Sequence, residues 1–372
     1  MSVEIREVLS KKDLKTFIHL PAKLHRNEKN WVPPVYMDDR IYFNPRKNKS
    51  FSYSDTILLL AYQNGKAAGR IMGLINHRYN EIKQENHTRF CWFEGYENEE
   101  VAINLLQAIE TWAKDKGCLR LVGPFGFSDK DPQGFLIDGF EYLPVIASNY
   151  NSPKAPEFMM KSGYEKEVDL VVYKLDIPKE LPDFYQKIYS RISGNGDYRL
   201  VEYTKRSQLK KHIRPIFSLI NETFTHIYGF MPFEKKEMDD FANRYLAVIK
   251  PQYVKSVMKE DEIIAFVIGM PDISEGVKKA KGYVLPFGFF HILNAQKKTK
   301  RLSLLLGAIN QDYRGKGLDV LMGTKMIESA WKGGFEYIDS HLELEENAVM
   351  RAEMEKMGGK VYKKYRVFGK NL

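Results

Sequence analysis

The chain repeats one series of short motifs, and this duplication limits the folds open to it more than any other feature. Each match is weak alone, but all of them occur in the same order in both halves. The matching pairs are residues 31–34 with 230–233, 58–73 with 254–269, 109–114 with 327–332, and 159–163 with 354–358. The sequence therefore predicts two similar halves in tandem.

The length agrees with this duplication, because 372 residues fit two domains of roughly 180 residues better than one. Pro178 and Pro182 interrupt a strand pattern near the middle, and a helix over residues 183–193 leads into the second copy. We expect a first domain over residues 1–177 and a second over 178–372.

Strand and helix patterns alternate in both halves. In the first, Asn64 and Gly65 mark the turn of a β-hairpin, and residues 101–116 form a helix. In the second, strands over 302–309, 335–342 and 360–368 alternate with helices over 320–332 and 347–356. The expected class is α/β, with a mixed sheet of the α+β kind.

Residues 310–319 join the first of these strands to a helix through a basic, glycine-containing loop. The start of a helix leaves backbone N–H groups without intrahelical partners, and such groups bind phosphate well. Gly315 and Gly317 permit a tight turn, while Arg314 and Lys316 add positive charge. The spacing matches neither common nucleotide-binding loop. We therefore predict a cradle for a pyrophosphate.

This strand, the run YRGKG and the following helix resemble the acyl-CoA pyrophosphate loop of the GNAT acyltransferase superfamily. The stretches 31–34, 123–124, 134–144, 313–317 and 363–367 also make nearly the whole chain similar to a bacterial family of tandem GNAT-like proteins of this length. The resemblance implies two tandem GNAT-like acyl-CoA N-acyltransferase domains. The corresponding turn of the first half carries carboxylates instead of the loop, so the first domain is expected to be degenerate.

The resemblance implies acetyl-CoA, or another acyl-CoA, as a co-substrate bound by the second half, with no metal. The residues expected to hold it are Gly307, Ala308, Ile309, Gln311, Arg314, Gly315, Lys316, Gly317 and Leu318. The basic run 297–301, just before the strand, is the expected contact for the 3′-phosphate of CoA.

An amine acceptor needs a general base. The candidates are His341, Glu343 and Glu345, and the preferred pair is Glu345 with Asn347, at the point where the strand ends. Tyr365 is the candidate proton donor to the leaving thiolate. Each of these residues also has a purely structural interpretation, as helix capping or core packing.

Two positions depart from the GNAT pattern. Met354 stands where many relatives carry a tyrosine, and a thioether donates no proton. Asp319 places a carboxylate beside the expected phosphates. The predicted activity is N-acyl transfer, usually acetyl transfer, to an amine of a small molecule or peptide. A non-catalytic GNAT-fold binding or regulatory protein and an aminoacyl-transferase of the peptidoglycan-bridge type remain alternatives.

Composition narrows the partners. The net charge of +9 comes without any nucleic-acid-binding motif, and no apolar run reaches the length of a membrane span. Without a signal peptide at the N-terminus and with only two cysteines, we expect a cytoplasmic protein with neither nucleic acid nor membrane as partner. The aromatic residues of the loops, among them Phe287, Phe289 and Phe290, are expected to cap the core. The oligomeric state stays open.

Overall fold

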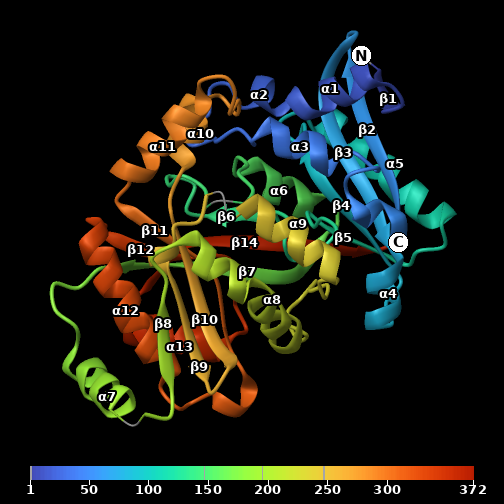
Figure 1. The fold of residues 1–372 in the computed structure, drawn as a ribbon. Helices are drawn as coiled ribbons and strands as arrows, with labels where there is room; N and C mark the ends of the chain where they lie inside the picture. Colours follow the sequence, from blue (N-terminus) through green and yellow to red (C-terminus); the bar gives the residue numbers. More distant parts are fainter. Residues whose placement is uncertain (1, 146, 195, 246–247) are drawn as a thin grey trace.

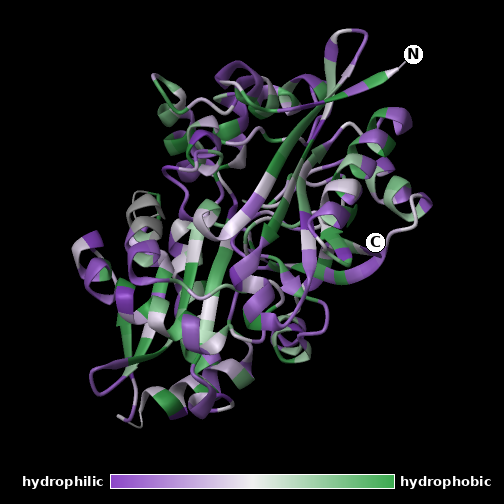
Figure 2. Cartoon of the chain, turned by 90° about the vertical axis from the view of Figure 1, so that its right-hand side faces the viewer, coloured by the Kyte–Doolittle hydropathy of each residue, from purple (hydrophilic) through white to green (hydrophobic). Residues whose placement is uncertain are grey.

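The computed structural model describes residues 2–145, 147–194, 196–245 and 248–372. Within these ranges, strands from both halves form one continuous mixed sheet of fourteen strands, and helices cover both of its faces (Figure 1). Several strands contain long hydrophobic stretches (Figure 2). The expected α/β class with a mixed sheet is confirmed.

The first half contributes strands and helices in alternation. Their bounds are β1 (Val3–Glu7), α1 (Lys11–His19), α2 (Pro21–Leu24), α3 (Tyr36–Tyr42), β2 (Ser54–Gln63), β3 (Lys66–Asn76), α4 (His77–Lys83), β4 (His87–Glu94), α5 (Glu99–Asp115), β5 (Arg120–Gly123), β6 (Phe135–Asp138), α6 (Lys154–Lys161) and β7 (Glu165–Asp176).

The second half follows the same plan. A pair of helices, α10 and α11, stands in the place where the first half has helix α4. Its bounds are α7 (Asp183–Ser193), β8 (Arg199–Glu202), α8 (Arg206–Thr223), α9 (Lys235–Tyr245), β9 (Val254–Lys259), β10 (Glu262–Pro271), α10 (Ser274–Lys279), α11 (Gly288–Lys298), β11 (Arg301–Ile309), α12 (Leu318–Gly333), β12 (Tyr337–Ser340), β13 (Glu343–Leu344), α13 (Ala348–Lys356) and β14 (Lys360–Asn371).

The two halves exchange their last strands. The order of the main path is β1-β2-β3-β4-β5-β14-β7-β12-β11-β10-β9-β8. The last strand of the second half, β14, therefore pairs with β5 of the first, and β7 of the first half pairs with β12 of the second. The antiparallel pair of β7 and β14 lies at the centre, with Tyr365 opposite Leu170.

Local chemistry explains the elements beside these strands. Asn64 and Gly65 have φ angles of 53° and 73°, the left-handed values that a two-residue hairpin turn requires. Asn98 caps α5 by accepting a hydrogen bond from the amide of Val101 at 3.3 Å. Gly334, with φ of 71°, ends α12 in the left-handed conformation that is common after helices.

The helices divide the sheet into two covered faces. Helices α5, α6, α12 and α13 pack on one face through apolar clusters that include Leu105, Met159, Ile327 and Met354. Helices α1, α3, α8 and α10 lie over the other face. Within the described ranges, no helix is both long and apolar enough to cross a bilayer.

Candidate functional site

The sheet opens in the middle of the second half. Strands β11 and β12 pair in parallel only from Arg301 to Leu304, and the amide of His341 donates to the Leu304 carbonyl at 2.9 Å. A β-bulge follows, because β10 pairs with Leu304 and with Leu306 but skips Leu305. Beyond it β11 pairs with β10 alone, while the chain after β12 pairs with β7 through β13. A wedge-shaped gap in hydrogen bonding results between β11 and β13.

The predicted loop lies at the end of β11 and leads into α12. Gly315 and Gly317 have φ angles of 73° and 83°, and a Cβ added at Gly315 would meet no atom of the described residues within 4 Å. Arg314 and Lys316 are exposed. The loop thus presents backbone and two cations to solvent at the start of a sixteen-residue helix.

The residues expected to hold a cofactor form one continuous stretch in space. Gly307, Ala308 and Ile309 end β11, Gln311 lies in the exposed turn after it, and Leu318 begins α12. The Leu318 side chain is fully buried, so only its backbone is available to a ligand. That these residues bind an acyl-CoA stays a prediction. In the structure they lie beside the opening in the sheet.

Helix α7 covers one side of this loop. A Cβ at Gly317 would lie 2.2 Å from Cδ1 of Ile192 and 3.0 Å from Cγ2 of Ile188. Glycine is therefore required at this position both by its φ angle and by the close approach of α7. Any ligand at the loop must approach from the side of Gly315.

A pair of carboxyl groups joins α12 to α13 next to the loop. Asp319, in the first turn of α12, makes a side-chain hydrogen bond with Glu353 of α13, and Lys356 forms an ion pair with Glu353 at 2.9 Å. Burial, together with Glu353, raises the pKa of Asp319. The ammonium of Lys356 offsets part of the negative charge that a diphosphate would meet here.

The preferred catalytic pair, Glu345 and Asn347, stabilises the start of α13. Glu345 forms ion pairs with Lys166 at 3.0 Å and Lys364 at 3.7 Å, and the hydrogen bond from Lys166 lowers the pKa of Glu345. The Asn347 side chain accepts a hydrogen bond from the amide of Met350 at 3.3 Å. A carboxylate held ionised in this way is a weak base at neutral pH.

Tyr365 and Met354 lie in the core. Tyr365 is fully buried on β14, and its hydroxyl lies 3.1 Å from Oγ of Ser148. Burial raises the pKa of Tyr365. Met354 packs against Val171 and Tyr173 on the face covered by α13. The site residues named from the sequence are thus divided between opposite faces of the sheet.

Glu343, also a candidate from the sequence, lies on the wall of the opening. It pairs with Val171 in the register of β13 and β7, so its side chain shares the face on which Val171 packs with Leu304. Leu304 is the last β11 residue paired with β12. Burial raises the pKa of Glu343 to about 8. The sequence identified this carboxyl but could not reveal its burial, which depends on the position of β7.

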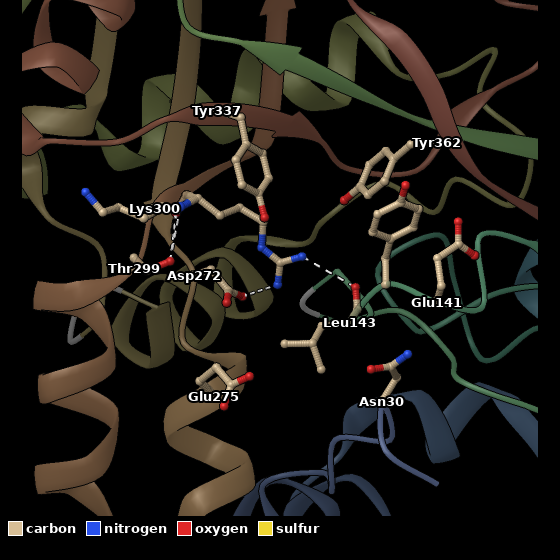
Figure 3. A pocket seen from close by; sticks show the side chains of 11 residues that line it. Asn30, Glu141, Leu143, Asp272, Glu275, Thr299, Lys300, Tyr337 and Tyr362 are labelled. Carbon is tan, nitrogen blue, oxygen red and sulfur yellow. Dashed lines mark hydrogen bonds and ion pairs between the residues drawn. The ribbon is translucent and has the colours of Figure 1, made fainter.

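A cavity of about 330 Å³ lies between the two halves, at the start of β11 (Figure 3). Its lining combines Asn30, Glu141, Tyr142 and Leu143 of the first half with Asp272, Glu275, Thr299, Lys300, Arg301, Tyr337 and Tyr362 of the second. Arg301 is paired with Asp272, which leaves two carboxylates, Glu141 and Glu275, against one ammonium group, that of Lys300, in the lining. The cavity therefore favours a cationic or hydroxylated guest.

Arg301 links the two halves at the base of this cavity. It contacts Asp272 at 2.6 Å and Asp339 at 3.5 Å, and donates to the carbonyl of Pro144 at 3.2 Å. The expected 3′-phosphate contact at 297–301 is thereby wrong, because this run lies at the opposite end of β11 from the loop. Nine residues of strand, at about 3.3 Å each, separate them by roughly 30 Å.

The corresponding turn of the first half is filled. Gly95 and the buried Tyr96 replace the basic loop, and Glu97 forms an ion pair with Lys154 at 2.6 Å. The Glu97 carboxylate at this turn would repel an anionic ligand. Among the described residues, no cluster of His, Cys, Asp and Glu side chains could hold a metal ion.

Two bacterial proteins are similar in sequence to this chain over nearly all of its length. No protein-family model matches the chain. It is 27% identical over 367 residues to a bacterial ceramide synthase of Caulobacter vibrioides, which covers 97% of this chain and 95% of that protein. It is 24% identical over 381 residues to the protein YghO of Escherichia coli, covering 99% and 95%.

Solved structures resemble the fold. A tandem GNAT protein from the clavulanic acid biosynthesis pathway has a TM-score of 0.56 and 10% identity, with 100% of this chain and 98% of that one covered. A GCN5-related N-acetyltransferase of Sphaerobacter thermophilus has a TM-score of 0.54 and 11% identity, covering 99% and 95%. The fold of the chain is that of the tandem GNAT proteins.

Proposed function

We propose that this chain, with its tandem GNAT fold, is an N-acyltransferase that takes the acyl group from an acyl-CoA bound by its second half. One observation carries the proposal. The sheet opens at Leu305, and the strand that leaves the ladder there ends in an exposed glycine loop at a helix start. A thioester in the opening and a diphosphate on the loop would lie along the second half of the same strand.

The chain's own groups then have definite tasks. From Leu305 to Ile309 one edge of β11 pairs with β10, and the other edge faces the opening, so its N–H groups can stabilise the oxygen of an attacked carbonyl. Glu343 first takes a proton from the substrate ammonium, and the neutral amine then attacks. The amine nitrogen bonds to the acyl carbon, the C–S bond breaks, and the CoA thiolate leaves as an anion. The nitrogen releases its second proton to solvent and the thiolate takes up a proton from solvent, which removes the need for a donor at Met354.

We infer further that the acceptor is a long-chain amino alcohol. A ceramide is an N-acylated amine of that type, and the Caulobacter protein named for its synthesis is similar over nearly the full length of this chain. The reacting nitrogen would lie in the opening beside Glu343. The cavity between the halves lies on the opposite face of the sheet, where Glu141 and Glu275 could receive the hydroxyl groups of such a molecule.

The first test is binding of long-chain acyl-CoA, acetyl-CoA and free CoA by titration calorimetry. The variant is Arg314→Glu with Lys316→Glu, since both side chains are exposed and their replacement leaves the packing of Gly317 intact. The matched control is Lys210→Glu with Lys211→Glu on α8. We expect the loop variant to weaken binding more than about tenfold and the control to bind as wild type does.

The second test is product formation. Incubation with palmitoyl-CoA and sphinganine should give an N-acyl product detectable by mass spectrometry, whereas acetyl-CoA with spermidine should not. Binding without any amide product would favour the non-catalytic alternative. The absence of CoA binding altogether would refute the proposed co-substrate.

A further inference from the structure

The excursion between β10 and β11, residues 272–300, has its acidic residues, Asp272 and Glu275, at its start and is basic beyond them. Residues 276–300 contain no aspartate or glutamate. They contain six lysines, namely Lys278, Lys279, Lys281, Lys297, Lys298 and Lys300. This segment is therefore strongly basic for its length.

The same segment exposes large apolar side chains. The exposed fractions are 49% for Tyr283, 70% for Leu285, 70% for Phe287, 58% for Phe290 and 50% for Leu293. The last three are spaced by three residues, so they lie along one side of α11 and its first turn. The expectation that the aromatic residues here cap the core is wrong for Phe287 and Phe290. Apolar groups gathered in this way mark an interaction surface.

The excursion is held firmly on its inner side. Gln296 donates to the carbonyl of Val248 at 3.0 Å, and Ile292 packs against the apolar cluster below. A Cβ at Gly276 would lie 2.7 Å from the His291 carbonyl oxygen, so α10 and α11 are in close contact. The outward face of α11 therefore belongs to a helix whose inner side is packed against the protein.

The first half supports the tip of the excursion. The amide of Tyr36 donates to the Gly282 carbonyl at 3.1 Å, and the Tyr283 ring lies 4.9 Å from that of Tyr36. Figure 1 shows α10 and α11 at the outer edge of the molecule, beside α2. Lys23 of α2 adds a further positive charge there.

We propose that the α10–α11 excursion docks the protein on an anionic membrane surface. Phe287, Phe290 and Leu293 would enter the interfacial region, and the lysines on both sides would contact lipid phosphates. A second copy is a poor occupant of this face, because self-association would bring six lysines against another six. This proposal replaces the expectation that no membrane is a partner.

The docking would orient the cavity between the halves. Glu275, Thr299 and Lys300, at the two ends of the excursion, line that cavity. A membrane under α11 would therefore lie beside the cavity, and a long-chain amine could pass from the bilayer into it. This last step rests on the proposed function, whereas docking itself does not.

The experiment is co-sedimentation of the protein with vesicles. Vesicles of phosphatidylcholine alone are compared with vesicles containing 30% phosphatidylglycerol, at 0.05 and 0.5 M salt. We expect binding to the anionic vesicles that falls with salt. Two triple variants are tested. The apolar variant combines Phe287→Ser, Phe290→Ser and Leu293→Ser. The lysine variant combines Lys279→Gln, Lys297→Gln and Lys298→Gln.

Each variant has a control matched in chemistry. The apolar control changes Leu9, Met160 and Val349 to Ser. These three side chains are exposed elsewhere on the molecule. The charge control changes Lys210, Lys211 and Lys332 to Gln. We expect at least a tenfold loss of vesicle affinity in the apolar variant and about a 100-fold loss in the lysine variant. The controls should stay within about threefold of wild type.

Several results would overturn the proposal. No binding to anionic vesicles would do so, and so would an equal loss of affinity in test and control variants. A lipid-free dimer that the apolar variant dissociates would assign the surface to a second copy instead. CoA titration of the same variants separates this proposal from the proposed function, because docking variants should keep wild-type CoA affinity.

Discussion

Replacing Glu343 with glutamine should make the protein more stable and less active at the same time. The carboxyl lies on the wall of the opening, and burial raises its pKa from an ordinary 4.5 to about 8. The folded state therefore holds a proton that the unfolded state releases at neutral pH. Such a group costs folding free energy as the pH rises above 4.5, and the cost is complete only above pH 8. Glutamine removes that cost.

The magnitude follows from the two pKa values. Between 4.5 and pH 7 lie about 2.5 pH units, each equivalent to about 1.36 kcal/mol, so the upper limit of the cost is about 3 kcal/mol. The Glu343 side chain keeps partial contact with solvent, which reduces the expected gain to between about 1 and 3 kcal/mol. Loss of the general base should lower kcat/KM by about 100-fold or more.

Urea unfolding at pH 5, 7 and 9, together with kcat/KM from pH 6 to 10, tests both effects. The stabilisation should grow from pH 5 to pH 9, and the wild-type rate should rise to a plateau with an apparent pKa near 8. Glu345→Gln is the matched control, since its carboxylate is already ionised and paired with Lys166. It should lose at most about 1 kcal/mol and little activity. A Glu343→Gln protein with wild-type rate and stability would refute the reasoning.

Three further changes probe the surrounding structure. Asp319→Asn should tighten CoA binding by about three- to tenfold at pH 8, measured by titration, because it removes a carboxylate beside the loop; unchanged affinity would argue against a diphosphate at this position. Arg301→Met should cost about 3–5 kcal/mol in urea unfolding, since both of its aspartate partners would stay buried without it; a loss below 1 kcal/mol would contradict this. Gly317→Ala should destabilise more than Gly315→Ala by about 1 kcal/mol or more, because only its new methyl would overlap Ile192; equal thermal midpoints would show that α7 moves aside freely.

Local chemistry made several elements of this fold predictable. The Asn64–Gly65 turn needs left-handed backbone that these two residues adopt readily, and the hairpin of β2 and β3 forms around it. The helix expected over residues 183–193 has the same bounds in the structure, where it is α7. The strand, loop and helix around Gly315 also lie where the sequence predicts them.

The features that position the site depend on distant contacts. Nothing in the alternation along β7 or β14 specifies the half with which each strand pairs, so their exchange cannot be read from local pattern. The burial of Glu343 follows from that exchange, because β13 pairs with β7. Likewise Phe287 and Phe290 have the composition of core residues, and only the tertiary structure reveals that they face outward.

The exchange of strands also explains how a half without a pyrophosphate loop contributes to the site. Strand β7 belongs to the first half, yet it pairs with β12, β13 and β14 and so forms the wall opposite β11. Without it, β12 would have a free edge and Glu343 would lose the neighbour that buries its face. The opening therefore needs both halves, although the expected ligand-binding loop lies in one.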